Sequence, residues 1–151
     1  MHLDLDNARY QDQKDCMNQI IADGQSPFLP KNLAKYHSDP IIKQGKFWYI
    51  TKNQWPYQNT LHHYLIISNL YWTQITDLDP QAGPELIEFT QWLCQHLQVP
   101  GGAICLRFGD TNYSGGTIDH LHWQFIVPNL KAPTYERVKF SIGKKRSKLS
   151  P

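Results

Sequence analysis

The side chains best suited to chemistry are concentrated in one short segment, residues 115–128, which reads GGTIDHLHWQFIVP. Alternate side chains of a β-strand share a face. We therefore expect His120, His122 and Gln124 to project together, while the apolar residues between them face a core. Two imidazoles and a carboxamide can donate hydrogen bonds to phosphate oxygens, and a neutral imidazole can attack phosphorus.

Further candidates for anion binding lie before this strand. The loop at residues 109–116 (GDTNYSGG) includes Gly115 and Gly116, and its backbone N–H groups and the hydroxyl of Thr117 suit an anion. Arg107 could clamp a phosphate, and Asn59 and Asn112 could contact ribose or phosphate. The H-x-H spacing is equally compatible with a zinc or iron site completed by a third ligand, or with a polar face that has no function.

Apolar periodicity and glycine or proline stops predict the elements that position these residues. We expect a helix over 6–23 ended by Gly24, an irregular connection over 25–45, and a helix from 77–80 to about 100. Strands are expected over 47–51, 63–67, 103–108 and 120–127, with a fifth over 137–142. This order predicts an α+β fold with a mostly antiparallel sheet.

Composition excludes several classes of protein. A chain of 151 residues with 40% apolar and 19% charged residues fits one folded domain, here 1–143. Three Cys without a C-x-x-C pair exclude a disulfide framework. The longest apolar run, 64–67, is too short for a membrane span, and residues 1–6 lack signal-peptide features, so we expect a cytoplasmic protein.

The basic charge is uneven along the chain. A C-terminal tail, 144–151, holds four of the 15 Lys and Arg residues, which leaves 11 basic against 13 acidic residues in the rest of the chain. The body is therefore not a basic platform for nucleic acid, and we expect neither a nucleic-acid nor a membrane partner.

The segment H-L-H-W-Q-F-I-V resembles the signature of the histidine triad (HIT) superfamily, H-φ-H-φ-H-φ-φ preceded by G-x-[ST]-[VI]-x, where φ is apolar. Residues 63–67 (HYLII) are similar to the superfamily's H-φ-L-φ-I strand, and with IIADG at 20–24 the similarity spans roughly residues 16–128. The resemblance implies a HIT-like antiparallel sheet of about five strands, with a long packed helix and an N-terminal helix. It also implies a homodimer.

The resemblance further implies a nucleotidyl hydrolase or transferase. By position, His122 attacks the α-phosphate of a nucleotide and forms a nucleotidyl-imidazole intermediate, while His120 and His63 orient the site. Thr117, with the Gly115–Gly116 turn, contacts phosphate. The implied substrate is a nucleotide phosphoanhydride such as a dinucleoside polyphosphate. No cofactor is required, and Mg²⁺ would arrive with the nucleotide.

The chain departs from the hydrolase pattern mainly at Gln124, which stands where the third His is expected. This variant resembles the branch with galactose-1-phosphate uridylyltransferase and the dinucleoside polyphosphate phosphorylases. Glutamine cannot donate a titrating proton, so it favours a good leaving group and a phosphate acceptor. In addition, Gly116 replaces a polar residue, Tyr71 or Trp72 replaces a His, and Cys16 has no C-x-x-C partner.

Two alternatives from other classes remain open at this point. One is a metal-binding protein or metalloenzyme that uses His63, His120 and His122. The other is a catalytically weak nucleotide-binding module, in which Gln124 and Gly116 mark lost turnover. In either nucleotide reading, aromatic side chains are candidates to stack on a base. These candidates are Phe28, Trp48, Trp55 and Tyr57.

Overall fold

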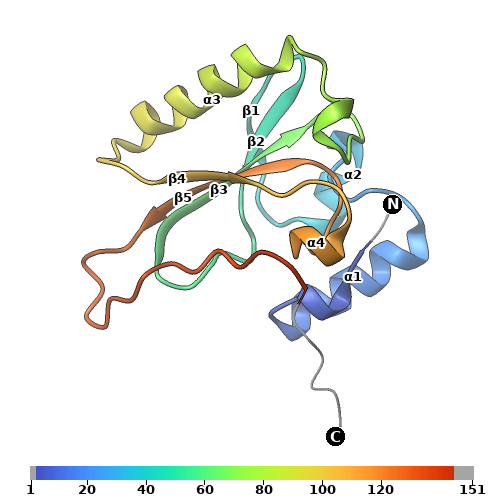
Figure 1. Ribbon diagram of the computed structural model, residues 1–151, viewed down its shortest axis with the longest axis horizontal. Helices are drawn as coiled ribbons and strands as arrows, with labels where there is room; N and C mark the ends of the chain where they lie inside the picture. Colours follow the sequence, from blue (N-terminus) through green and yellow to red (C-terminus); the bar gives the residue numbers. More distant parts are fainter. Residues whose placement is uncertain (1–2, 145–151) are drawn as a thin grey trace, which may run out of the picture.

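The apolar strands form one antiparallel sheet in the order β1-β2-β3-β5-β4. The computed structural model describes residues 3–144 (Figure 1). The strands are β1 (Ile41–Gln44), β2 (Trp48–Lys52), β3 (Thr60–Ser68), β4 (Ala103–Leu106) and β5 (His122–Pro128). The histidine-bearing strand β5 thus lies between β3 and β4, where both of its edges are paired.

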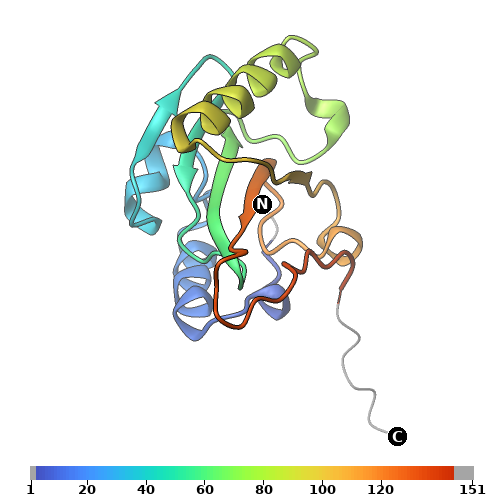
Figure 2. The ribbon, with the colours of Figure 1, turned by 90° about the vertical axis from the view of Figure 1, so that its left-hand side faces the viewer.

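Helices cover both faces of the sheet. They are α1 (Gln11–Asp23), α2 (Pro30–Tyr36), α3 (Ala82–Leu97) and the short α4 (Thr111–Ser114), with 3-10 turns at Leu5–Asn7 and Ile75–Asp77. The long helix α3 packs on one face, and α1 and α2 lie on the other (Figure 2). No helix within residues 3–144 is long and apolar enough to cross a membrane.

Each face of the sheet carries its own apolar core. The core on the α3 side holds nine buried residues, five from the sheet and four from α3: Trp48, Ile50, Ile66, Phe125, Val127, Ala82, Leu86, Phe89 and Leu93. The core on the α1–α2 side holds another nine, of which Met17 and Ile20 belong to α1 and Leu33 and Tyr36 to α2: Met17, Ile20, Phe28, Leu33, Tyr36, Tyr49, Leu65, Ile67 and Ile118. Because His122 pairs with Ile67 and Gln124 with Leu65, both polar side chains belong to the α1–α2 face. The alternation expected for this strand is confirmed.

Several element boundaries predicted from the sequence were wrong. The expected irregular connection contains α2 and β1, and Pro30 occupies the first helical turn, where proline needs no hydrogen-bond partner. The first helix begins at Gln11, after a separate 3-10 turn that Asp4 caps. Residues 137–142 form no strand, and the Ser141 carbonyl accepts a hydrogen bond from the Arg107 side chain.

One carboxylate joins α3 to the β1–β2 hairpin. Glu85, in the first turn of α3, accepts hydrogen bonds from the backbone N–H groups of Lys46, Phe47 and Trp48 at 2.7, 2.7 and 2.9 Å. Gly45 makes this approach possible, because a Cβ there would lie 2.2 Å from Glu85 Oε1. The contact fixes α3 on the face of the sheet where Phe125 and Val127 of β5 are packed.

We expect Glu85→Ala to lower the free energy of unfolding by about 2 kcal/mol, because three backbone donors lose a charged acceptor. Urea unfolding followed by circular dichroism measures this. The matched control is Glu88→Ala, three residues further along α3, since the exposed carboxylate of Glu88 contacts only Lys43, at 3.8 Å. Equal destabilisation by both variants would contradict the role given to Glu85.

Candidate active site

His122 is the first residue of β5, and its ring orientation is fixed by its own chain. Its Nδ1 lies 2.8 Å from the carbonyl oxygen of His120. A carbonyl can only accept, so Nδ1 carries the proton and Nε2 keeps a lone pair. Within residues 3–144 nothing hydrogen-bonds to Nε2, and the ring lines a cavity. His122 therefore offers an unprotonated nitrogen to a ligand.

His120 is fully buried, and both of its ring nitrogens are engaged. Nε2 donates to the carbonyl oxygen of Ser68 at 2.9 Å, so Nδ1 is the acceptor and receives the hydroxyl proton of Ser26 at 2.7 Å. Phe28 meets the rings of His120 and His122 edge-on at 6.0 and 5.0 Å. His120 thus cannot contact a substrate, but it holds the carbonyl that orients His122.

His63 fixes the orientation of Gln124 in the same way. The backbone N–H of Tyr57 donates to His63 Nδ1 at 3.0 Å, so Nε2 carries the ring proton. Nε2 in turn donates to Gln124 Oε1 at 3.1 Å. The carboxamide oxygen of Gln124 is thereby occupied, and its N–H₂ group remains available to the cavity that Gln124 lines.

All three imidazoles are neutral at physiological pH. Burial lowers the pKa of His63, His120 and His122 to about 4, since the charged form loses its hydration. The hydrogen bonds to Gln124, Ser68 and the His120 carbonyl oppose this shift without reversing it. A neutral His122 at pH 7 is the form that can act as a nucleophile.

The cavity beside His122 has a volume of about 600 Å³ and lies on the α1–α2 side of the sheet. It is large enough for a nucleotide-sized ligand. Residues predicted from the sequence that line it are Asn59, Arg107, Gly115, Gly116, Thr117, His122 and Gln124. Phe28, Trp55 and Tyr57 also line it, whereas Trp48 packs under α3 on the opposite face.

The loop at residues 109–116 was expected to bind an anion through its backbone N–H groups, but the N–H groups of Gly115 and Gly116 are already hydrogen-bonded. Gly115 has a φ of +69°, its N–H donates to Thr111 O, and the N–H of Gly116 donates to Ser114 Oγ. These two amides are therefore taken, and the loop presents Thr117 to the cavity instead. Asn112, predicted to bind substrate, lies away from the cavity, and its side chain donates to Asp110.

The three-histidine metal site is not supported by this geometry. His120 has no free nitrogen, and His63 is directed at Gln124. In the part of the chain that the structure describes, no three His, Cys, Asp or Glu side chains gather as a metal site. The buried histidines are instead hydrogen-bonded one by one to the backbone, a hydroxyl and a carboxamide.

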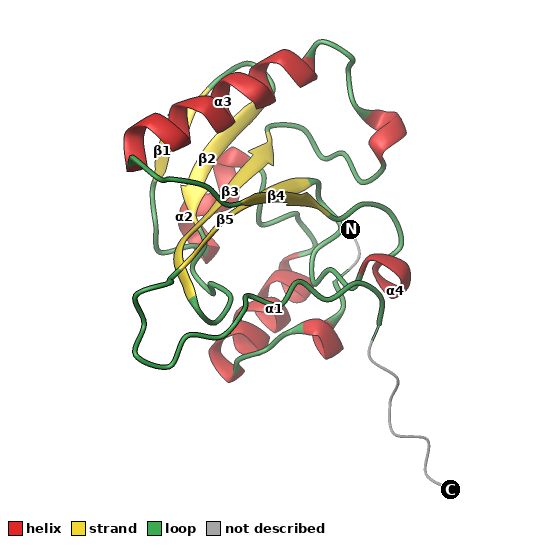
Figure 3. Ribbon diagram, turned by 60° about the vertical axis from the view of Figure 1, so that its left-hand side comes forward, coloured by secondary structure: helices red, strands yellow, loops and turns green. Residues whose placement is uncertain are grey.

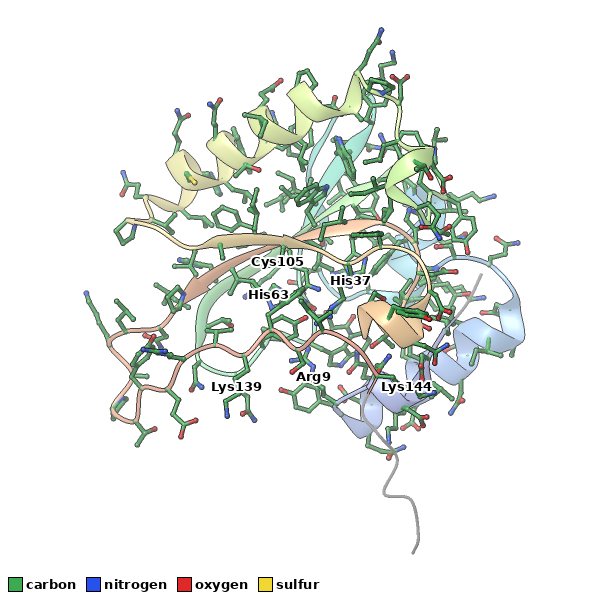
Figure 4. The ribbon with its side chains drawn as sticks, in the orientation of Figure 1. Arg9, His37, His63, Cys105, Lys139 and Lys144 are labelled. Carbon is green, nitrogen blue, oxygen red and sulfur yellow. The ribbon has the colours of Figure 1, made fainter. Side chains whose placement is uncertain are left out.

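Sequence analysis singled out Arg107 but missed the other basic side chains around the cavity, which are Arg9, Arg137 and Lys139. Arg9 donates to the carbonyls of Trp55 and Pro56 and lies 4.4 Å from the Tyr57 ring. Arg107 donates to the Tyr57 hydroxyl at 3.3 Å and to the carbonyls of Ser114 and Ser141. Arg137 and Lys139 complete the set. Arg9 and Lys139 lie below His63 in Figure 4. No motif marks these residues, because tertiary folding alone brings them together.

Comparison with known proteins identifies the fold. The chain matches no protein-family profile and no curated protein sequence. Among solved structures it is similar to a histidine triad nucleotide-binding protein from Candida albicans, with a TM-score of 0.53 and 16% identity over 86% of this chain and 85% of that one. A hypothetical histidine triad nucleotide-binding protein from Sulfolobus tokodaii gives 0.53 and 17%, over 80% of each chain. A HIT family hydrolase from Clostridium thermocellum gives 0.52 and 17%, over 69% and 91%. The expected HIT-like α+β fold is confirmed.

The neutral, buried imidazoles predict how stability depends on pH. The unfolded chain binds protons on these histidines near pH 6.5, whereas the folded chain binds them only near pH 4. The free energy of unfolding should therefore fall as the pH drops from about 6.5 to about 4, by up to about 1.4 kcal/mol per pH unit for each histidine. Urea unfolding between pH 7.5 and 4.5 measures this, and a flat profile would contradict it.

Long-range ¹H–¹⁵N spectra test the tautomers directly. At pH 7 we expect His122 protonated on Nδ1 and His120 on Nε2, because each of these nitrogens faces a backbone carbonyl, and His63 protonated on Nε2, because the Tyr57 N–H donates to its Nδ1. The exposed His96 serves as an internal reference. Protonation of His122 on Nε2, or on both nitrogens at pH 7, would show that the proposed lone pair is absent.

Proposed function

Because the chain has the fold of the histidine triad proteins, we propose that it is a nucleotide-binding enzyme that cleaves or transfers a nucleotidyl group from a phosphoanhydride. The reaction proceeds through a nucleotidyl intermediate on His122. The single observation that carries the proposal is the His122 ring, whose Nδ1–H is held by the His120 carbonyl while Nε2 faces the cavity.

In the first step, His122 Nε2 attacks the α-phosphorus of the bound nucleotide. A P–N bond forms, the bond from phosphorus to the bridging oxygen breaks, and that oxygen leaves with the electron pair on the departing phosphate chain. The ring becomes cationic while Nδ1 keeps its proton, and the hydrogen bond to the His120 carbonyl stabilises that charge. The N–H₂ group of Gln124 donates to a phosphoryl oxygen, and Thr117 contacts the same group from the loop.

In the second step an acceptor oxygen attacks phosphorus and the P–N bond breaks, which returns the pair to Nε2. Gln124 supplies no proton to the leaving group. A phosphate chain needs none, since it is a stable anion at neutral pH, whereas an alcohol or amine leaving group would. Gln124 therefore supports an anionic leaving group, and we assign inorganic phosphate as the preferred acceptor.

The remaining parts of the proposal follow from the same chemistry. No redox cofactor is required, and Mg²⁺ enters with the nucleotide. Trp55, half-buried at the cavity wall, is the best placed of the aromatic candidates to stack on the base, since Phe28 braces the histidines and Tyr57 lies under Arg9. We assign the enzyme to the cytoplasm as a homodimer. The edge strand β4 supports the dimer, since it exposes Ile104, and Phe108 is exposed two residues after the strand ends.

The reaction is tested with diadenosine tetraphosphate, with and without inorganic phosphate, by separating the nucleotide products. We expect ADP and ATP, formed only when phosphate is present, because phosphate then accepts the adenylyl group from His122. AMP and ATP formed without phosphate would keep the His122 mechanism and overturn the assignment of the acceptor. Binding without product would instead indicate a nucleotide-binding module.

The nucleophile is tested by His122→Ala, which should lower the rate about 10³-fold or more because the covalent step is lost. The matched control is His96→Ala, since His96 is exposed and stacks on Trp92 on α3, away from the cavity. Acid quenching with radiolabelled substrate should trap adenylate on the unaltered chain and not on His122→Ala. Retained turnover by His122→Ala would refute the mechanism.

A further inference from the structure

The chain after β5 forms neither helix nor strand, and it runs back past α1 towards α4 (Figure 3). We call residues 129–144 the C-terminal strap. The cavity wall includes Arg137, Lys139 and Ser141 from this strap, together with residues from α1 and the glycine loop. The strap is therefore part of the site wall.

The strap is held in place by contacts with Arg107, Gly115 and Asn112. Arg107 donates to the Ser141 carbonyl, and its guanidinium lies 3.9 Å from the centre of the Phe140 ring. Gly143 packs so closely on Gly115 that a Cβ at Gly115 would lie 2.8 Å from the Gly143 carbonyl oxygen. The backbone N–H of Lys144 donates to Asn112 O at 2.9 Å. These contacts fix the segment that carries Arg137 and Lys139.

The charges facing the cavity are unbalanced. Among residues 3–144, no carboxylate lies within 4.0 Å of Arg9, Arg137 or Lys139. The acidic side chains of the wall are Asp6 and Glu136, and Lys144 pairs with Asp6 at 3.4 Å. Cations gathered without counter-charges repel one another, so an anion that binds between them relieves that repulsion.

We propose that Arg9, Arg137 and Lys139 form a subsite for the phosphate chain that lies beyond the phosphorus attacked by His122. This assignment rests on the proposed function and adds the class of substrate, a nucleotide whose leaving group is itself an oligophosphate. One phosphoryl group at His122 is already served by Gln124 and Thr117. Further cations on the wall match the further charges of a longer chain.

The strap also explains how the leaving group is selected. A neutral leaving group gains nothing from Arg137 and Lys139, whereas each added phosphate brings a charge within their reach. Because Gln124 cannot protonate a leaving group, the same site needs one that departs as an anion. Strap and Gln124 therefore select the same kind of substrate for different physical reasons.

The test is calorimetric titration of the full-length chain with inorganic tripolyphosphate and, separately, with orthophosphate. We expect tripolyphosphate to bind the unaltered chain more tightly. The double variant Arg137→Gln/Lys139→Gln should weaken tripolyphosphate binding about tenfold or more and remove most of its advantage over orthophosphate. The difference should shrink as salt is raised.

The matched control is Lys14→Gln/Lys131→Gln, which changes the net charge equally at two exposed lysines outside the cavity wall. It should change tripolyphosphate binding by less than about twofold. Equal weakening by both double variants, no weakening by Arg137→Gln/Lys139→Gln, or equal affinity for tripolyphosphate and orthophosphate would each overturn the proposal. So would tighter binding of a single-stranded oligonucleotide than of tripolyphosphate, which would point to a nucleic-acid surface.

Repeating the titration with His122→Ala separates this inference from the proposed function. The subsite needs no covalent chemistry, so His122→Ala should bind tripolyphosphate as the unaltered chain does. If nucleotidyl transfer survives in His122→Ala, the proposed function fails and the subsite stands. If transfer requires His122 and Arg137→Gln/Lys139→Gln binds tripolyphosphate normally, the subsite fails and the proposed function stands.

Discussion

The site depends on one constraint, which is that three imidazoles are buried in the neutral form. In a neutral ring one nitrogen donates and the other accepts, so each needs a hydrogen-bond partner of the opposite kind wherever it contacts the protein. The carbonyl of His120 accepts from His122, and the ring of His120 is locked between Ser26 and Ser68. The first residue of β5 therefore has one possible tautomer. The position of β5 between β3 and β4 in turn brings His63 beside Gln124. Fold and reactivity share this one set of hydrogen bonds.

The three histidines are not equivalent, because only His122 lines the cavity, whereas His120 and His63 lie behind the residues that do. His122 and Gln124 line the cavity, whereas His120 and His63 lie behind them and hold them in place. This division explains why a glutamine is structurally compatible with the third position, since its oxygen accepts from His63 as its N–H₂ group turns to the cavity. What changes is the chemistry, because an amide donates a hydrogen bond without transferring a proton.

The sequence predicted the sheet, the long helix and the grouping of His122, Gln124 and Thr117, because strand alternation and helical periodicity are local properties of the chain. It did not predict the strap, since Arg137 to Ile142 have strand-like residues and nothing local shows that Arg107 would take the Ser141 carbonyl. The basic wall was missed for the same reason, because Arg9 and Lys139 lie 130 residues apart. Asn112 was predicted to contact the substrate, but its backbone N–H and its side-chain amide both donate to Asp110, which caps α4.

Residues near both ends of the described chain contact the loop at residues 109–116. Asn7 donates to the Gly116 carbonyl across 109 positions of sequence, and the close packing of Gly143 on Gly115 adds the other end. During synthesis the sheet and its α3 face can assemble once β5 has emerged, but the cavity wall remains open until residue 143 follows. Contacts this distant in sequence form late, since loop closure must precede them. The cavity beside His122 is thus the last part of the molecule to be completed, and a nascent chain in which His122 is already folded would still lack the strap residues of the cavity wall.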